Sequence, residues 1–350
     1  MGRSPCNRPK VSVVVPTSGG RALLARCVAS LGAQRFRDFE TIVVDNASNT
    51  AADPVHRRLP DVRVIPLARD VGFAAAANAG ARAAAGNYIA FLNDDVEADP
   101  SWLGELVACL ERHPRAASVA PKVRRSDDIR ELDGAGDGMT LALKAYRRGQ
   151  GRRDDGRYDT EEQVFSASGT ACLWRADVFR SLGEFDSSFF AYYEDVDLGF
   201  RARRAGYECW YAPRAVAVHR GSATAASRWR EFESGYAVRN RWATIVKNAP
   251  ARWVARHAHW IVAGEVLSLG RAAIAGDLGL MLRAYVDVAR SARAERAKRR
   301  LAVGRPDVPY AELMRTVTRR LPPPATSLWR FRLGRRLRGG AEPHRGTACT

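Results

Sequence analysis

Two adjacent carboxylates follow directly on an apolar run in Tyr88-Ile89-Ala90-Phe91-Leu92-Asn93-Asp94-Asp95-Val96. A short apolar run of this kind is typical of a buried strand. Carboxylates are costly to bury at the end of such a strand unless a cation or a polar ligand accompanies them. We therefore expect this strand to end at a binding site to which Asp94 and Asp95 contribute.

Strand-like and helix-like segments alternate on both sides of this run. β-Branched segments predict strands over 11–16, 39–44 and 62–67, and amphipathic or Ala-rich segments predict helices over 21–33, 74–85 and 102–112. This alternation favours an α/β fold with a mostly parallel sheet flanked by helices. Ligands bind such sheets outside the carboxyl ends of the strands. Pro16, Asp45 and Asn93 stand at these ends, so we expect them to share one rim.

A second acidic cluster begins where an aromatic run ends, in Phe189-Phe190-Ala191-Tyr192-Tyr193-Glu194-Asp195-Val196-Asp197-Leu198. The acidic residues of this cluster lie at the start of a predicted amphipathic helix. One group of carboxylates can hold a divalent cation while another acts as a general base. The two clusters therefore predict one cleft, with a metal at one wall and a catalytic carboxylate at the other.

The net charge of +18 is concentrated towards the C-terminal end, where residues 251–350 hold 20 Arg or Lys and 7 Asp or Glu. Basic segments are typical of contacts with nucleic acids or anionic membranes, although a general drift towards arginine is an alternative. The strands lack the aromatic–basic interleaving of nucleic-acid surfaces, so we expect no nucleic-acid partner. Charged residues interrupt the apolar helical stretches after residue 250. These helices are therefore expected to lie on an anionic membrane surface or to form a homo-oligomer contact.

The organisation predicted for the chain is a catalytic domain over 1–250 and a helical, Arg-rich extension over 251–350. Residues 124–163, rich in Arg, Asp and Gly, predict a long surface excursion. There is no uninterrupted apolar window of about 18 residues and no pattern of a secretory signal. Six cysteines without Cys-x-x-Cys spacing indicate reduced thiols. We expect a cytoplasmic protein, peripheral on the cytosolic face of the membrane.

Three common site motifs are absent. The chain has no P-loop and no Gly-x-Ser-x-Gly nucleophile elbow. Gly134-x-Gly136-x-Gly138 lies in the polar excursion rather than between a strand and a helix, so it is not a dinucleotide fingerprint. Phosphate chemistry at this site would therefore depend on a metal ion.

The motifs, taken in order, resemble those of family 2 glycosyltransferases, and especially the rhamnosyltransferase-like branch. They are Pro16, Val43-Val44-Asp45-Asn46-Ala47-Ser48, Asn78, Asn93-Asp94-Asp95, Gly169-Thr170, Phe185-Asp186, Tyr193–Leu198, Arg201 and His219, with Arg239-Asn240 as a feature of the branch. The resemblance covers roughly residues 10–250. It implies a GT-A fold, a nucleotide-diphosphate sugar donor (dTDP or UDP), Mn²⁺ or Mg²⁺, and inversion at the anomeric carbon. Asp70 replaces the usual Asn before Val71-Gly72, which leaves the donor open.

The resemblance assigns Asp95 and His219 to the metal and Asp94 to the ribose or sugar. A divalent cation stabilises the charge on the departing diphosphate, and an imidazole ligand would favour Mn²⁺. His219 is alternatively a buried histidine without a metal. Asp195 is assigned as the base that deprotonates the acceptor hydroxyl, with Tyr192, Tyr193 and Glu194 on the acceptor side. Acids in a first helical turn also complement the helix dipole, which accounts for Glu194 but not for the aromatic approach.

The remaining donor-side candidates are Pro16, Thr17, Asp45, Asn78, Asn93 and Arg201. Asp45 can accept the imide N–H of uracil or thymine, or cap a turn. Asn78 is unfavourable in the middle of a helix, so it is expected to face a polar group. Arg201 either contacts the diphosphate or pairs with Asp197 four residues earlier on its own helix.

The predicted activity is inverting, metal-dependent transfer of a rhamnose-like or other hexose to a hydroxyl of a cell-envelope or lipid-linked glycan. A nucleotidyltransferase also needs paired carboxylates and a metal, but no Gly-rich triphosphate loop follows the first strand. A catalytically inactive GT-A-like binding protein is the other alternative. It would have no reason to retain Asp95, Asp195 and His219 together.

Overall fold

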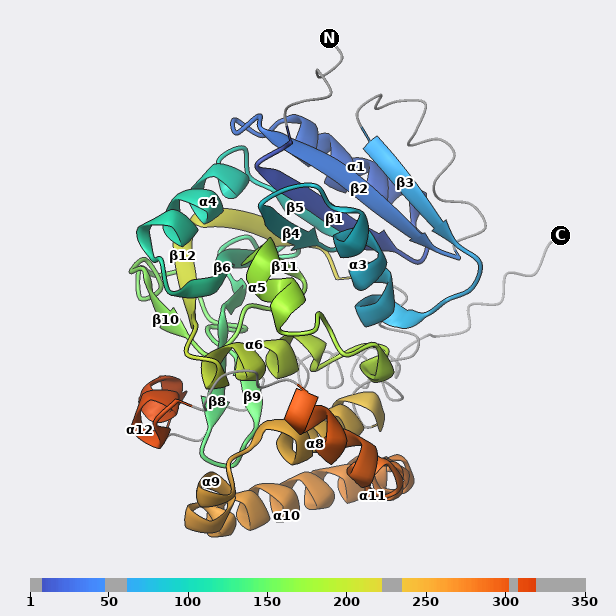
Figure 1. Cartoon of the computed structure of the whole chain (residues 1–350), viewed down its shortest axis with the longest axis vertical. Coiled ribbons are helices and arrows are strands. Elements are labelled where there is room, and N and C mark those ends of the chain that lie inside the picture. Colours follow the sequence, from blue (N-terminus) through green and yellow to red (C-terminus); the bar gives the residue numbers. More distant parts are fainter. Residues whose placement is uncertain (1–7, 48–61, 222–234, 302–307, 319–350) are drawn as a thin grey trace, which may run out of the picture.

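A ten-stranded mixed sheet runs through the centre of the computed structural model, which describes residues 8–47, 62–221, 235–301 and 308–318 (Figure 1). The strand order is β10-β12-β6-β11-β4-β1-β2-β3, with β5 beside β12 and β7 beside β6. The strands are β1 (Val11–Thr17), β2 (Phe39–Asn46), β3 (Val62–Leu67), β4 (Tyr88–Leu92), β5 (Val96–Ala98), β6 (Ala116–Arg125), β7 (Leu132–Ala135), β10 (Glu162–Val164), β11 (Ala171–Arg175) and β12 (Glu208–His219).

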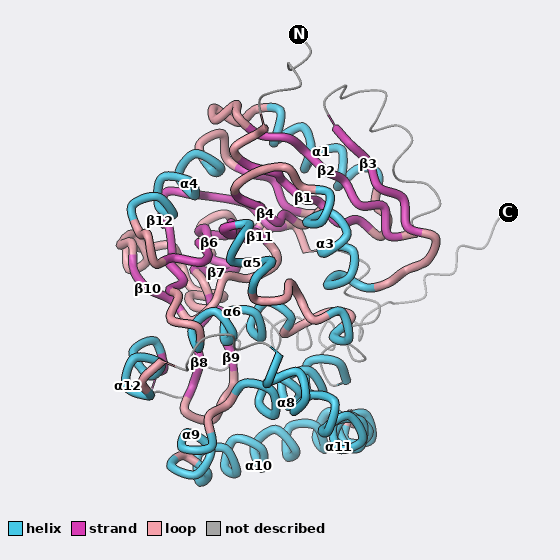
Figure 2. Tube along the Cα trace, in the orientation of Figure 1, coloured by secondary structure: helices cyan, strands magenta, loops and turns pink. Residues whose placement is uncertain are grey.

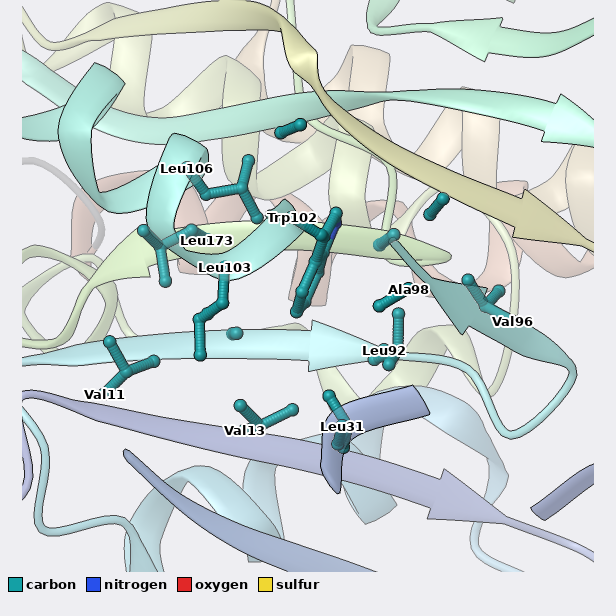
Figure 3. Close-up of a cluster of buried hydrophobic side chains, with 14 of the residues drawn as sticks. Val11, Val13, Leu31, Leu92, Val96, Ala98, Trp102, Leu103, Leu106 and Leu173 are labelled. Atoms are coloured by element: carbon teal, nitrogen blue, oxygen red, sulfur yellow. The ribbon is translucent and has the colours of Figure 1, made fainter. Parts of the chain in front are cut away.

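The half of the sheet formed by β3, β2, β1 and β4 is parallel, as the strand–helix alternation predicts. Every residue of β1 is buried, because helices cover both faces. α1 (Arg21–Gly32) and α4 (Trp102–Arg112) cover one face, and α3 (Gly72–Ala83), α5 (Ala176–Ser181) and α6 (Glu194–Arg204) cover the other. Figure 3 shows Trp102, Leu103 and Leu106 of α4 among the side chains of the first face. The other half is mixed, because β11 is antiparallel to both β4 and β6.

The prediction of a surface excursion over 124–163 is wrong for much of its length. β7 pairs with β6, and β8 (Asp137–Thr140) and β9 (Ala145–Arg147) form a hairpin. All four residues of β8 are buried. Many polar residues of this stretch are exposed, but some are paired in the interior, such as Asp154, whose Oδ1 lies 2.8 Å from Nζ of the buried Lys122.

The C-terminal helices pack below the sheet in Figures 1 and 2. They are α8 (Ala237–Asn248), α9 (Ala251–Arg256), α10 (Ala258–Ala275) and α11 (Leu278–Leu301), followed by α12 (Tyr310–Leu313), a 3₁₀ turn (Met314–Thr316) and β13 (Val317–Thr318). β13 extends the β8–β9 hairpin into a three-stranded sheet. Residues 319–350 of the predicted Arg-rich extension lie outside the described residues.

The tip of the β8–β9 hairpin is inserted between these helices. The Trp253 indole N–H donates a 3.1 Å hydrogen bond to the Leu141 carbonyl, and Arg241 Nε donates a 3.1 Å bond to the Leu143 carbonyl. Lys144 Nζ donates a hydrogen bond to the Gly264 carbonyl of α10. The division at residue 250 stays a prediction, but the described part of the extension packs closely on the catalytic half.

Lys247 of α8 is buried between two carboxylates. Its Nζ lies 2.7 Å from Asp186 Oδ2 and 2.8 Å from Asp197 Oδ2. Lys247→Met should lower the free energy of unfolding by about 3 kcal/mol, because removing one partner leaves buried charge uncompensated. Lys298→Met is the control, since Lys298 also binds Asp186 but its side chain is 33% exposed. Urea denaturation measures both, and equal losses would contradict the prediction.

Candidate active site

Thr17 and Asp94 connect the carboxyl ends of β1 and β4. The Thr17 hydroxyl donates a 2.5 Å hydrogen bond to Oδ2 of Asp94. Burial raises the pKa of Asp94 to about 7, the hydrogen bond from Thr17 opposes this shift, and the charge of Asp95 adds to it. A carboxyl group with this pKa exists in both protonation states near neutral pH. Asp94 can therefore accept a hydrogen bond from a sugar hydroxyl or, when protonated, donate one.

Asp95 begins a chain of charged side chains. Its Oδ2 lies 3.3 Å from Nε2 of His219, and Nδ1 of His219 lies 3.1 Å from Oδ2 of Asp133. Arg147 Nη1 donates a 2.6 Å hydrogen bond to the same Asp133 oxygen. Strand pairing brings these distant residues together, because His219 at the end of β12 lies opposite Val96 of β5, next to Asp95.

Asp95 and His219 have the donor set of a divalent-cation site. Asp95 Oδ1 is buried and has no hydrogen-bond partner among the described residues. The 3.3 Å separation of oxygen and nitrogen fits an ion pair, and it also fits two ligands of one cation. Ligand bonds of about 2.1 Å at right angles place neighbouring ligand atoms about 3 Å apart. Asp133 binds Nδ1 of His219, which is the position of the outer carboxylate that orients a metal-binding imidazole. These residues therefore fit Mn²⁺ or Mg²⁺.

The electrostatics of this group favour positive charge between the two carboxylates. Burial lowers the pKa of His219, but hydrogen bonds to Asp133 and Asp95 outweigh burial and raise the pKa to about 9. Burial also acts to raise the pKa of Asp133, but the charge of Arg147 and the bond from His219 hold this pKa well below its usual range. A bound cation would supply the same positive charge and would require neutral imidazole.

Asp195 lies in the first turn of α6 with both carboxylate oxygens held by the backbone. The Gly169 N–H donates a 2.8 Å hydrogen bond to Oδ2, and the Val196 N–H donates a 2.7 Å bond to Oδ1. Each oxygen retains a second lone pair, so the group is fixed in direction and can still accept a bond from a hydroxyl. A Cβ at Gly169 would lie 2.9 Å from the Phe73 ring, so this close approach of the backbone requires glycine.

Arg147 lies between the two groups of carboxylates. Besides Asp133, it bonds Thr170 Oγ1 at 2.9 Å, and its charge acts on both Asp137 and Asp195. Burial and the charge of Asp195 raise the pKa of Asp137 to about 7. A small cavity lies at this point, and its lining includes Asp133, Asp137, Arg147, Ser168 and Thr170.

Glu194 and the two tyrosines before it lie next to Asp195, on the predicted acceptor side. Glu194 is buried, and burial together with the charge of Asp195 raises its pKa well above the usual value. Its Oε2 has no hydrogen-bond partner among the described residues. Tyr192 and Tyr193 have positive φ angles of 70° and 71°, which are strained for residues other than glycine.

Two donor-side candidates are occupied by protein groups. Asn78 donates a 2.8 Å bond to the Phe185 carbonyl and accepts a 3.1 Å bond from the Phe185 N–H. Arg201 is buried, with Nε 2.9 Å from Asp197 Oδ2 and Nη2 2.7 Å from the Glu184 carbonyl. These contacts favour structural roles for both residues in holding the segment before the 3₁₀ turn Ser187–Phe189.

The other rim candidates lie where the strand pattern predicts. Asp45 of β2 pairs in register with Thr17 of β1 and is half-buried. Pro16 is buried in β1, and the Asn93 N–H donates a 2.9 Å bond to the Thr170 carbonyl. Asp70, the departure from the family pattern, has its own role.

Asp70 holds the start of α3. Its Oδ1 accepts a 2.7 Å bond from Asn46 Nδ2 and a 2.9 Å bond from the Gly72 N–H. The carboxylate oxygen of Asp70 therefore accepts the hydrogen bond from the Gly72 N–H that the amide oxygen of an asparagine would accept, which explains how an Asp can stand here in place of the usual Asn.

Sequence reasoning missed Asp133, Asp137 and Arg147. The alternating glycines at 134, 136 and 138 were a usable signal, because glycine in a strand often marks a close approach of backbone or ligand. Gly138 shows this, since a Cβ there would lie 2.4 Å from the Tyr146 ring.

Among the described residues, one group of three has ligand atoms close enough to share a metal ion, namely Cys109, His113 and Glu161. His113 Nε2 lies 2.7 Å from Glu161 Oε1, and Arg112 binds the second oxygen of Glu161. Because Arg112 already supplies the positive charge at this carboxylate, we assign the cluster to an ion-pair network.

The chain is similar to several known glycosyltransferases. The model of Glycosyl transferase family 2 matches residues 12–183, and that of Glycosyl transferase family group 2 matches residues 156–289. The O-antigen biosynthesis protein RfbC of Myxococcus xanthus is 32% identical over 225 residues, which are 62% of this chain but 18% of that protein. The N-acetylglucosaminyl-diphospho-decaprenol L-rhamnosyltransferase of Mycobacterium tuberculosis is 28% identical over 229 residues, 59% of this chain and 75% of that protein.

A solved structure with a similar fold is the mannosyltransferase PcManGT from Pyrobaculum calidifontis, in complex with GDP-Man and Mn²⁺. It has a TM-score of 0.52 and 18% identity and covers 87% of both chains. The fold is thus GT-A, and the two family models together extend from the first strand to the C-terminal helices. The chain belongs to glycosyltransferase family 2 and is an enzyme of that family.

Proposed function

We propose that this glycosyltransferase is inverting and metal-dependent, and that it moves a rhamnose-like hexose from a dTDP- or UDP-sugar to a lipid-linked or cell-envelope glycan. The observation that supports this most is the pair of carboxylate groups on either side of Arg147. Asp95 with His219 forms one group, and Asp195 belongs to the other. A direct displacement needs this separation of a leaving-group side from a base side.

The donor occupies the rim of the sheet in this proposal. Thr17, Asp45, Asn93 and Asp94 surround the nucleotide and sugar, and Asp95 and His219 hold the divalent cation. When bound, the cation neutralises charge on the departing diphosphate.

The base side follows from the contacts of Asp195. Two backbone N–H groups orient its carboxylate, and the free lone pairs accept the proton of the acceptor hydroxyl during attack. Arg147 binds Asp133 and so stabilises the histidine–carboxylate pair beside the metal.

The acceptor class rests on the relatives. The mycobacterial relative is named for transfer to N-acetylglucosaminyl-diphospho-decaprenol, and the Myxococcus relative is named for O-antigen biosynthesis. We take a polyprenyl-diphosphate-linked sugar as the acceptor class because the mycobacterial name contains one, and such an acceptor fits an enzyme that works at a membrane surface.

A two-stage experiment tests this function. Thermal shifts with dTDP-rhamnose, UDP-glucose and GDP-mannose, each with Mn²⁺ or Mg²⁺, identify the donor, since ligands that bind the native state stabilise it. Transfer to a synthetic N-acetylglucosaminyl-diphospho-polyprenol then tests activity, and NMR of the product gives the anomeric configuration. Donor binding without turnover would indicate an inactive binding protein. Release of inorganic diphosphate from a nucleoside triphosphate would indicate a nucleotidyltransferase.

The described C-terminal helices offer a surface for the peripheral membrane contact in this proposal. None of the helices in the described ranges is both long and apolar enough to cross a bilayer. α10 and α11 nevertheless expose large apolar side chains, among them Trp260, Val262, Val266, Leu267, Ile274 and Leu282. Ile274 is 85% exposed. In this proposal these exposed apolar side chains are buried in the interfacial plane of a membrane.

The charges around this face favour an anionic lipid surface over a second copy of the chain. Arginines at 252, 256, 271, 283 and 290 are exposed. The acids of α10 and α11 mostly turn inwards, since Glu265 binds Arg241 and Glu295 binds Lys298. A two-fold contact would bring like charges together, whereas each arginine near anionic lipid adds about 1 kcal/mol of attraction.

The double variant Val266→Glu/Ile274→Glu should lose most binding to anionic liposomes at low salt, because it places carboxylates in the apolar face. Ile129→Glu is the control, since Ile129 is 60% exposed but lies far along the chain from these helices. Cosedimentation with phosphatidylglycerol vesicles measures binding, and high salt should weaken it for the unchanged protein. Equal binding of the double variant and the control would contradict the membrane proposal, and loss of a dimer in the double variant would favour oligomerisation.

A further inference from the structure

The segment Phe189–Tyr193, here called the acceptor loop, has an unusual backbone. Phe190, Tyr192 and Tyr193 have φ angles of 61°, 70° and 71°. Such conformations cost on the order of 1–3 kcal/mol each for residues other than glycine, and they persist only where the surroundings hold them. The loop leads directly into Asp195, so the groups that hold the loop also affect the place where an acceptor meets this carboxylate.

Asn240 holds the acceptor loop from α8, which packs against α6 (Figure 1). The residue is completely buried. Its Nδ2 donates to the carbonyl oxygens of Phe189 at 2.8 Å, Ala191 at 2.9 Å and Tyr192 at 2.8 Å. Its Oδ1 accepts a 3.0 Å bond from Arg239 Nη1, which fixes the orientation of the amide. Two N–H groups thus serve three carbonyls, so at least one of these bonds is shared.

The donor half of the protein holds the same loop from the other side. The Phe190 carbonyl accepts a 3.2 Å bond from the Ala74 N–H at the start of α3. The Phe190 ring stacks at 5.5 Å on Tyr236, the residue before α8, so this second contact is on the same side as Asn240. A Cβ at Gly72 would lie 2.5 Å from the Phe190 oxygen, so the contact depends on glycine there. The acceptor loop is therefore fixed between the donor rim and α8.

We propose that Asn240 is a positioning residue for sugar transfer: it keeps the acceptor loop in its strained conformation and thereby places the acceptor hydroxyl against Asp195. This rests on the proposed function only in assigning Asp195 as the base and the loop as the acceptor side. An amide suits the position because it donates to the carbonyls through its nitrogen while its oxygen accepts from Arg239. A carboxylate of the same shape would repel the carbonyl oxygens.

Asn240→Ala and the milder Asn240→Ser, which keeps one donor, test the proposal. Asn248→Ala is a matched control, because Asn248 lies on the same helix, is also completely buried, and donates a 2.6 Å bond to Asp197 Oδ1. Hydrogen exchange followed by mass spectrometry should show faster exchange over residues 187–194 in both Asn240 variants and not in the control. Exchange in β1 and α3 should stay unchanged.

Kinetics separate positioning from a general loss of stability. With the synthetic polyprenyl acceptor, Asn240→Ala should raise the acceptor KM about tenfold and lower kcat about 10²-fold, the scale of a displacement near 1 Å. The donor Kd should stay within about twofold, because no donor residue moves. Asn240→Ser should fall between the alanine variant and the unchanged protein.

Two results would overturn the proposal. One is unchanged exchange over residues 187–194. The other is a loss of kcat at constant acceptor KM together with a fall in melting temperature that matches Asn248→Ala. The exchange measurement needs no substrate, so it shows whether Asn240 holds the acceptor loop even if the unchanged protein transfers no sugar. A lack of transfer by the unchanged protein would count against the proposed function alone.

Discussion

Asp195→Asn should lower the rate of sugar transfer by about 10²–10⁴-fold, the range for loss of a positioned general base. The amide has one acceptor oxygen, whereas Asp195 accepts from the Gly169 N–H through one oxygen and from the Val196 N–H through the other. One backbone N–H therefore loses its partner, and we expect a loss of about 1–2 kcal/mol in the free energy of unfolding. Donor binding should be nearly unchanged, because the donor residues lie at the rim of the sheet.

Asp177→Asn is the control for the helix-dipole alternative. Asp177 is also an acid in the first turn of a helix, but it is exposed and belongs to α5. If such acids only complemented the helix dipole, each variant would change only the stability of the protein, and neither would lose transfer activity. Transfer at the normal rate by folded Asp195→Asn protein would exclude the residue as the base.

Removal of the metal should abolish transfer, and Mn²⁺ or Mg²⁺ should restore it. Asp95→Asn and His219→Ala should each remove most Mn²⁺ binding, because each loses one of two proposed ligands. Asp133→Asn should weaken Mn²⁺ binding about 10–100-fold, since it orients the imidazole through Nδ1 without touching the cation. Electron paramagnetic resonance of free Mn²⁺ measures these affinities without an activity assay.

Glu97→Gln is the control for charge at the same rim. Glu97 lies two residues after Asp95, but its carboxylate pairs with Arg26 at 2.8 Å. Its replacement should leave Mn²⁺ affinity within about twofold, since Arg26 and Arg220 already pair with its charge. Full activity in excess chelator would show that the diphosphate charge is stabilised by protein groups instead.

The parallel half of the sheet and the rim of the site could be predicted from the sequence, because both follow from local patterns. Runs of β-branched residues are typical of strands in a parallel sheet whose two faces are covered by helices, and the carboxyl ends of parallel strands lie at one edge of the sheet. Thr17 and Asp94 are 77 residues apart, and the parallel pairing of β1 with β4 in the structure brings them together at that edge. His219 was found through the order of motifs, and the pairing of β12 with β5 explains its place.

The rest depends on contacts between segments distant in sequence. In the sequence Arg147 and Asp133 look like surface residues, since nothing local shows that the Asp133 carboxylate binds both Arg147 and His219. Asn78 could be predicted to face a polar group, but the partner, the backbone of Phe185, lies 107 residues away. Arg201 had two local interpretations, and the carbonyls of a separate loop make the structural one preferable.

The insertion of the β8–β9 hairpin between the C-terminal helices has a consequence for exchanging parts among related enzymes. The hairpin carries Arg147 into the active site at one end and contacts Trp253 and Gly264 at the other. α8, the first of these helices, also binds the loop before Asp195. In a chimera that takes only residues 1–250 from one parent enzyme, the two sides of these contacts would come from different proteins. We therefore expect a working chimera to need three segments from the same parent, namely residues 137–147, 186–195 and 237–301.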